Sequence, residues 1–257
     1  MLGGLEPLPT RAALLIAEYR QDLALVHHLG FGFHAAACAP GIIERLERVR
    51  RRDGLVLEIG CGSGLLTKEL VAAGHRVVAT DASPAMLELA RATAPGAEEI
   101  RLLVLPDDPL PEADAVVGCG HALNYLPDLD TVHRALEAIA RALRPGGLLA
   151  LDLCDLEWGR ARSDLDSQGR VGDDWAIITR FSVPAPDRFV RDMTTFVRRD
   201  GGWARDDEHH ENVLVDTEEA AERLAAWGVT ARVGHAFGRE VLPAGLRVIV
   251  GERPPAT

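Results

Sequence analysis

Three alternating glycines follow a carboxylate in the stretch Glu58-Ile59-Gly60-Cys61-Gly62-Ser63-Gly64. Residues 55–57 are apolar, and residues 65–71 have apolar side chains at helical spacing, so the glycines are expected on a strand-to-helix turn. Glycine lets the backbone pass close to a ligand, and a helix N-terminus offers free N–H groups to an anionic group. A second strand-like run, residues 76–81, ends in Asp81, and a carboxylate at that point can hold a ribose diol. These residues predict a nucleoside-ligand site.

The spacing of the glycines favours one class of nucleoside. A dinucleotide fingerprint needs a sixth-position glycine for close packing of helix and strand, and this chain has Leu65 there. The Glu-x-Gly-x-Gly-x-Gly pattern instead resembles motif I of class I S-adenosylmethionine (SAM)-dependent methyltransferases, which hold the methionine carboxylate and ammonium at this turn. Two alternatives stay open. One is an NAD(P)-dependent oxidoreductase, against which the lack of a Tyr-x-x-x-Lys pair argues, and the other is a SAM-binding protein without catalysis.

The resemblance runs from about residue 55 to residue 155 and includes further segments in the family's order. Residues 81–87 resemble motif II, in which Ser83 is expected to cap a helix that starts at Pro84. Residues 113–120 resemble the fourth strand, and the Pro-Gly-Gly at 145–147 resembles the turn into the fifth. The resemblance implies SAM as cofactor. It assigns the ribose to the motif II carboxylate, the adenine to Ala82, Met86 and Asp107, and the methionine part to the end of the fourth strand, although Asp107 could equally be a solvated loop acid. The implied cofactor-binding residues are Glu58, Gly60, Cys61, Gly62, Gly64, Asp81, Ala82, Met86, Asp107, Cys119 and Gly120.

The length of 257 residues suits one α/β domain with an insertion. We expect a Rossmann-like class I methyltransferase sheet, with an N-terminal helical lid over residues 1–52. Within that lid, the Gly- and Pro-rich residues 1–10 are expected to be a loosely packed end, and Gly30, Gly32 and Pro40 are expected to interrupt the helices. The SAM-binding core is expected over residues 53–155 and 216–257, with the insertion at 156–215.

The insertion has a different period from the core. From Trp175 to Val183 apolar residues recur every second position, which is typical of a strand. Two more strand-like stretches, 189–199 and 203–215, are separated by the turn Asp200-Gly201-Gly202. We therefore expect a three-stranded antiparallel meander. Its placement resembles that in the glycine N-methyltransferase type and in nucleotide-sugar N-dimethyltransferases of antibiotic pathways. This resemblance implies a small-molecule acceptor, methylated on nitrogen or oxygen, in specialised metabolism, with the meander covering its pocket.

Methyl transfer needs alignment of donor and acceptor and, for many acceptors, a proton acceptor. Glu208, His210 and Asn212 share one face of the third meander strand, so His210 is the first candidate base, with Glu208 raising its pKa. The alternative is a charged edge strand that resists aggregation. Tyr19 and His27 are further catalytic candidates. Both are expected on the first helix, where they would cover SAM. The alternative is that they are partly buried helix residues whose polar groups hydrogen-bond to near neighbours.

Substrate-binding candidates follow the fourth strand, because that segment borders the methyl group in this fold. They are His121, Asn124 and Tyr125, although Asn124 could equally cap a helix. Arg180 and Arg239 could bind an acidic substrate group. His34 and His75 are expected at the surface.

The composition limits the partners. The formal net charge is −11 and the pI is near 5.3, and we find no Lys/Arg-rich run beyond residues 48–52. Nucleic-acid binding usually needs a basic stripe, so DNA and RNA are not expected as partners. No membrane-length apolar stretch or leader is apparent, so we expect a cytoplasmic protein with no membrane partner, and a homodimer is compatible with these features. The four cysteines, Cys38, Cys61, Cys119 and Cys154, lack metal-ligand spacing, which predicts reduced thiols and no metal.

Overall fold

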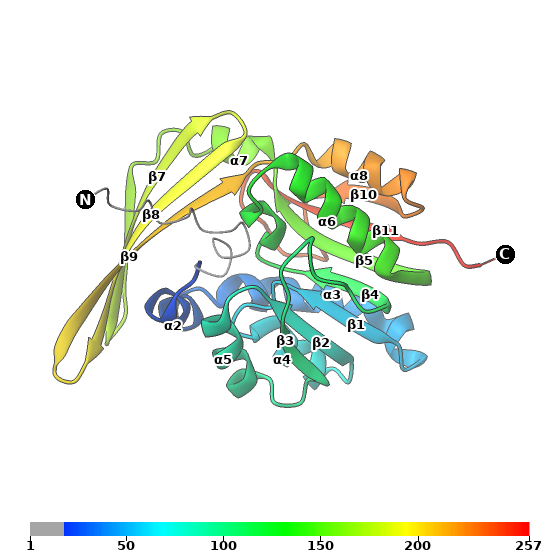
Figure 1. Cartoon of the computed structure of the whole chain (residues 1–257), viewed down its shortest axis with the longest axis horizontal. Coiled ribbons are helices and arrows are strands. Elements are labelled where there is room, and N and C mark those ends of the chain that lie inside the picture. The colour runs from blue at the N-terminus through cyan, green and yellow to red at the C-terminus, as the bar shows by residue number, and fades with distance from the viewer. Residues whose placement is uncertain (1–17, 257) are drawn as a thin grey trace, which may run out of the picture.

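The computed structural model describes residues 18–256, in which two sheets are arranged side by side (Figure 1). The larger sheet has seven strands in the order β10-β11-β5-β4-β1-β2-β3. Strands β1 to β5 run parallel, whereas β11 is antiparallel to β5 and β10 is antiparallel to β11. The expectation of a Rossmann-like sheet is confirmed. Its strands are β1 (Leu55–Ile59), β2 (Arg76–Asp81), β3 (Glu99–Leu102), β4 (Ala113–Gly118), β5 (Leu143–Cys154), β10 (Thr230–Gly234) and β11 (Leu246–Glu252).

Helices cover both faces of this sheet because its central strands are apolar on both sides. One buried cluster joins the sheet to α6 and α8, and a second joins it to α3, α4 and α5. Local capping agrees with the sequence, since the Ser83 hydroxyl accepts a hydrogen bond from the Met86 N–H at the start of α5, as predicted. The core helices are α3 (Phe33–Arg51), α4 (Leu65–Ala72), α5 (Pro84–Thr93), α6 (Leu129–Ala142) and α8 (Thr217–Ala226).

The second sheet is the insertion, and it has one strand more than predicted. It consists of β6 (Ser167–Val171), β7 (Trp175–Ala185), β8 (Arg188–Arg199) and β9 (Gly202–Val213), paired antiparallel in that order. Every residue of β6 is exposed, so the strand lacks the apolar alternation that marks β7 in the sequence. This sheet projects from the seven-stranded sheet (Figure 1). Two short elements lie where the sheets meet, the 3-10 helix η1 (Ala122–Tyr125) and α7 (Leu156–Arg160).

The N-terminal helix α2 (Gln21–Gly30) packs between the two sheets, against α5 on one side and the insertion on the other. Its buried Leu23 and Val26 contact Trp175 and Met193 of the insertion. The break between α2 and α3 falls at Gly32, as expected. Pro40 was expected to interrupt the next helix but lies inside α3, so that expectation was wrong. The loose end predicted at 1–10, and the rest of the predicted lid up to residue 17, lie outside the described residues.

The helices between residues 18 and 256 include none that is both long and apolar enough to cross a membrane.

Candidate functional site

A cavity of about 870 Å³ lies between the carboxyl ends of the parallel strands and the inner face of the insertion. Its floor comes from the turns after β1, β2 and β4, its roof from β7 and β8, and one wall from α2 and the residues just before it. In open α/β sheets the crevice at the carboxyl ends of the strands is where ligands bind.

The glycine turn forms part of the floor, and its backbone needs glycine. Gly60 has φ +66°, and a Cβ there would lie 2.2 Å from the Cβ of Ala122. Gly64 has φ +80°, and a Cβ there would lie 3.0 Å from the Cα of Ala90, where α4 approaches α5. A side chain at either position would therefore clash or strain the turn.

The Asp81 carboxylate holds this turn in place. Its Oδ2 accepts a hydrogen bond from the Gly62 N–H at 2.8 Å, and its Oδ1 accepts one from the Ser83 N–H at 2.8 Å. Glu58 is buried below the turn, where the Thr67 hydroxyl donates to its Oε2 at 2.7 Å. Burial raises the pKa of Asp81 and raises that of Glu58 to about 7. Two acidic groups thus lie at the end of the cavity where the sequence predicts the cofactor.

Nine of the eleven predicted cofactor residues line the cavity: Glu58, Gly60, Cys61, Gly62, Asp81, Ala82, Met86, Cys119 and Gly120. Gly64 instead packs against α5 at the start of α4. Asp107 was predicted near the adenine, but it is exposed and lies outside this cavity, with Arg134 3.9 Å away. The chain turns after β3, where the Asp107 N–H donates to the Val104 carbonyl, so the apolar Leu103 and Leu105 line the cavity in its place.

His210 faces inward as its strand pattern predicted, but it does not line the cavity that the described residues form. Its side chain is 1% exposed, and its Nε2 lies 2.9 Å from Glu208 Oε2. The rings of Tyr19 and Tyr125 cover it, with centroids 4.9 and 5.7 Å away. We predicted a raised pKa, and this was wrong: burial lowers the pKa of His210, and the hydrogen bond to Glu208 only partly opposes it.

Tyr19 and His27 both line the cavity, as expected of residues that cover a cofactor. Tyr19 is not on a helix, because it has φ +51° and precedes α2. Its ring meets the His27 ring edge-on, with centroids 5.2 Å apart. Burial lowers the pKa of His27 to about 4, so its imidazole is neutral at neutral pH.

Tyr125 lines the cavity beside a residue that sequence reasoning missed, Arg191. The Arg191 Nη2 donates to the Tyr125 hydroxyl and, at 3.1 Å, to Asn212 Oδ1. The Tyr125 and Tyr19 hydroxyls are 2.6 Å apart. The buried Nε of Arg191 finds no hydrogen-bond acceptor among residues 18–256, and no carboxylate there is within ion-pair distance of its guanidinium. The sequence does hold one indication of this role. Arg191 lies between Phe189 and Met193 on the same strand face, so it is an arginine on an otherwise apolar stretch of that face.

His121 lines the cavity, whereas Asn124 and Arg180 do not. The His121 ring stacks on Tyr125 at 5.7 Å, its Nδ1 is buried with no partner among the described residues, and burial lowers its pKa to about 3. Asn124 is fully buried and ties β5 to β9, since its amide group bonds to the backbone of Cys154 and Val213. Its predicted role as an acceptor contact or helix cap was therefore wrong.

Arg180 was predicted to bind substrate, but it is exposed on the face of β7 that points away from the cavity. Arg239 is also exposed and outside the cavity. Two histidines expected at the surface are not there. His75 is buried, and His34 lines the cavity with its Nε2 2.8 Å from the buried Asp152.

The sequence matches a known domain over the segment that forms the floor of the cavity. Residues 57–151 match the family model described as a methyltransferase domain. A putative methyltransferase of Bacillus subtilis, YqeM, is 27% identical over 180 residues, which cover 68% of this chain and 73% of that protein. An uncharacterized methyltransferase of Mycobacterium bovis, Mb3374, is 35% identical over 58% of this chain and 57% of its own length. Glycine N-methyltransferase of Mus musculus is 38% identical over 38% of this chain and 39% of its own.

Solved structures share the fold over most of the chain. A SAM-dependent methyltransferase from Clostridium acetobutylicum has a TM-score of 0.76 and 17% identity, covering 90% of this chain and 97% of that one. The sugar N-methyltransferase KedS8 from Streptoalloteichus has a TM-score of 0.71 and 21% identity, covering 99% of each chain. The similarity in fold therefore includes the insertion as well as the glycine turn.

Proposed function

This chain belongs to the SAM-dependent methyltransferases, and we propose that it methylates a small molecule carrying an anionic group. SAM is the methyl donor. In the proposed arrangement its ribose binds at Asp81, its adenine lies against Met86 and Leu103, and its methionine part reaches the end of β4. The acceptor then occupies the part of the cavity under β7 and β8.

Arg191 is the observation that supports an anionic acceptor. A buried cation without a counter-ion is costly, because burial removes water that would otherwise solvate the charge. Arg191 has hydroxyl and amide partners, but within residues 18–256 no carboxylate forms an ion pair with it, and its Nε is left without an acceptor. The Glu18 carboxyl interacts with Arg191 electrostatically, but burial raises the pKa of Glu18 to about 8, so at neutral pH it does not supply the counter-charge. A carboxylate or phosphate on the acceptor would supply the missing charge and accept a hydrogen bond from Nε.

Methyl transfer itself needs little from the protein beyond positioning, because the sulfonium of SAM is already activated. Holding donor and acceptor in line can contribute roughly 7–11 kcal/mol. Two neutral imidazoles, His27 and His121, border the cavity. Each can accept a hydrogen bond from an N–H or O–H group of the molecule that is to be methylated. The cationic Arg191 nearby also disfavours a second positive charge, which keeps an amine acceptor in its reactive neutral form.

Acceptors that differ only in charge test this proposal. Short amino acids would be compared with their primary amides, and sugar phosphates with the unphosphorylated sugars, by measuring S-adenosylhomocysteine formation by mass spectrometry. We expect turnover with the anionic member of at least one pair, and loss of that preference in Arg191→Met. Arg180→Met is the matched control, because Arg180 lies on the opposite face of the same sheet. Equal turnover of both members of every productive pair would contradict an anionic acceptor.

A further inference from the structure

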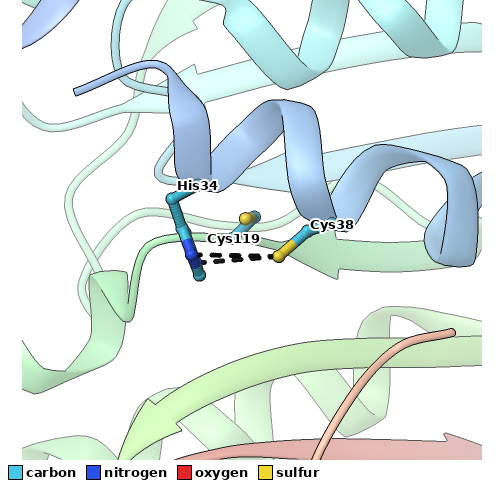
Figure 2. A group of neighbouring side chains, drawn as sticks. All are labelled: His34, Cys38 and Cys119. Carbon is cyan, nitrogen blue, oxygen red and sulfur yellow. Dashed lines mark hydrogen bonds between the residues drawn. The ribbon is translucent and has the colours of Figure 1, made fainter. Parts of the chain in front are cut away.

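Two thiols and an imidazole meet at the edge of the cavity, although the sequence spacing of the cysteines gave no sign of it. His34 and Cys38 come from the same turn of α3, four residues apart, and Cys119 comes from the end of β4 (Figure 2). Side chains at i and i+4 lie on the same face of a helix, which brings the first two together. The fold then places Cys119 opposite them.

The separations of these ligand atoms suit one metal ion. One ring nitrogen of His34 and the two sulfur atoms all lie within 4.8 Å of one another, and Cys38 Sγ is 3.9 Å from His34 Nδ1. Tetrahedral zinc has bonds of about 2.1 Å to nitrogen and about 2.3 Å to sulfur, so its ligand atoms stand roughly 3.6 Å apart. Small side-chain rotations would bring the three atoms to that separation.

A neighbouring carboxylate orients the imidazole for this role. Asp152 Oδ2 lies 2.8 Å from His34 Nε2, which fixes the proton on that nitrogen and leaves Nδ1 as the nitrogen that could bind a metal. Cys38 Sγ is 3.9 Å from Nδ1 and 3.8 Å from Nε2, so the ring must turn for Nδ1 to point at an ion held by the sulfur. Both Asp152 oxygens also accept backbone hydrogen bonds, from the N–H groups of Gly120 and His121. The carboxylate is thus a positioning group and not a fourth ligand. A carboxylate behind a metal-binding histidine is a common arrangement in zinc sites.

We propose that His34 Nδ1, Cys38 Sγ and Cys119 Sγ form a binding site for a thiophilic divalent ion, of which Zn²⁺ fits the ligand set best. His34 and Cys119 line the cavity whereas Cys38 is buried behind them, so the ion enters from the cavity and its fourth position faces it. Three protein ligands with one open position allow a water molecule or a ligand in the cavity to complete the coordination. This inference does not depend on the identity of the acceptor.

Cobalt titration of the reduced, chelator-treated full-length chain tests the site directly. We expect one Co²⁺ per chain, a near-ultraviolet thiolate-to-cobalt charge-transfer band, the visible bands of four-coordinate Co²⁺, and loss of both when Zn²⁺ is added. Because these signals are measured on the unmodified protein, the test does not depend on whether a variant folds. Saturation with Co²⁺ without a thiolate band would overturn the proposal.

Variants then assign the ligands. Cys38→Ser and Cys119→Ser should each weaken Co²⁺ binding at least tenfold and reduce the charge-transfer intensity. Cys61→Ser is the matched control, because Cys61 also lines the cavity but lies outside the cluster, and it should leave the spectrum unchanged. An unchanged spectrum in the Cys38→Ser, Cys119→Ser double variant, with circular dichroism showing a folded chain, would place the metal elsewhere and overturn the assignment.

The open position has its own test. Adding imidazole to the cobalt-loaded protein should shift the visible bands, since an outside ligand can replace the bound water. Bands that stay unchanged at saturating imidazole would mean that the protein fills all four positions, which contradicts the proposed open site.

Discussion

The guanidinium of Arg191 donates a hydrogen bond to the Tyr125 hydroxyl inside the cavity. This contact joins β8 of the insertion to η1 of the core. The Tyr125 hydroxyl is also 2.6 Å from that of Tyr19, so the segment before α2 belongs to the same network. Arg191 therefore lies at the centre of a hydrogen-bond network that links the insertion, the core and the segment before α2. We expect its replacement to weaken acceptor binding more than it weakens SAM binding.

Arg191→Lys should raise KM for the anionic acceptor roughly 10- to 100-fold, because a lost hydrogen bond to a charged group costs about 1.5–3 kcal/mol. Lysine keeps the charge but cannot donate along the guanidinium's fixed directions to Tyr125, Asn212 and the acceptor together. Steady-state kinetics with SAM saturating would measure the change, with Arg180→Lys as control. An unchanged KM, or an equal rise in the control, would argue against acceptor binding at Arg191.

His210 should prove to be a structural residue and not a base. It lies behind Tyr19 and Tyr125, and its Nε2 is engaged by Glu208. His210→Gln should lower the free energy of unfolding by about 1–3 kcal/mol, since it disturbs a buried hydrogen-bonded pair. The pH dependence of turnover should keep its shape, and the exposed His209→Gln should change neither property. Loss of one limb of the pH profile in His210→Gln alone would restore His210 as the base.

Stability should rise with pH between about 4 and 6.5, in part because of His27. Burial lowers the pKa of His27 from 6.5 to about 4, so in this range the unfolded chain binds a proton that the folded chain does not. Protonation of the unfolded state then favours unfolding as the pH falls. Relative to the wild type, His27→Leu should flatten this dependence by about 1–3 kcal/mol. Parallel curves of unfolding free energy against pH for the two proteins would contradict the assignment.

The expected N-terminal lid over residues 1–52 can be tested through α2, whose Leu23 packs against the insertion. Leu23→Ala should cost about 2–4 kcal/mol of stability, as is usual for a buried leucine. It should also speed SAM release, because the same packing holds Tyr19 and His27 over the cavity. Leu29→Ala, on the exposed face of α2, should do neither. Stopped-flow release rates that match the wild type in Leu23→Ala would contradict a lid role for α2.

How far the sequence predicts this protein depends on whether a feature is local. The glycine turn, the Asp81 position and the Ser83 cap follow from neighbours in the chain, and each was predicted correctly. Arg191 and the Cys38–Cys119 contact depend on strand pairing and helix placement across long separations, so no local pattern marks them. The fourth insertion strand was missed for another reason. Every residue of β6 is exposed, and no apolar period records its pairing with β7.

Three of the predicted site residues do not line the cavity, for reasons that differ. Asp107 and Arg180 have suitable side chains and suitable positions along the chain, yet a turn after β3 and the alternation of β7 direct them away from the cavity. His210 was assigned to the correct face of β9, but two tyrosines from elsewhere cover it. The sequence thus indicates which face a side chain takes, whereas the packing of distant elements decides what that face meets.

Calorimetric titration of SAM into the wild type, Asp81→Asn and Asp107→Asn tests whether SAM binds in this cavity with its ribose at Asp81. We predict one SAM per wild-type chain and an affinity roughly 10- to 100-fold weaker in Asp81→Asn, because asparagine removes the charge from the hydrogen bonds to the ribose. Asp107→Asn should bind SAM like the wild type, since Asp107 is exposed outside the cavity. Equal affinity in the wild type and Asp81→Asn, or a loss confined to Asp107→Asn, would contradict the placement of SAM in this cavity.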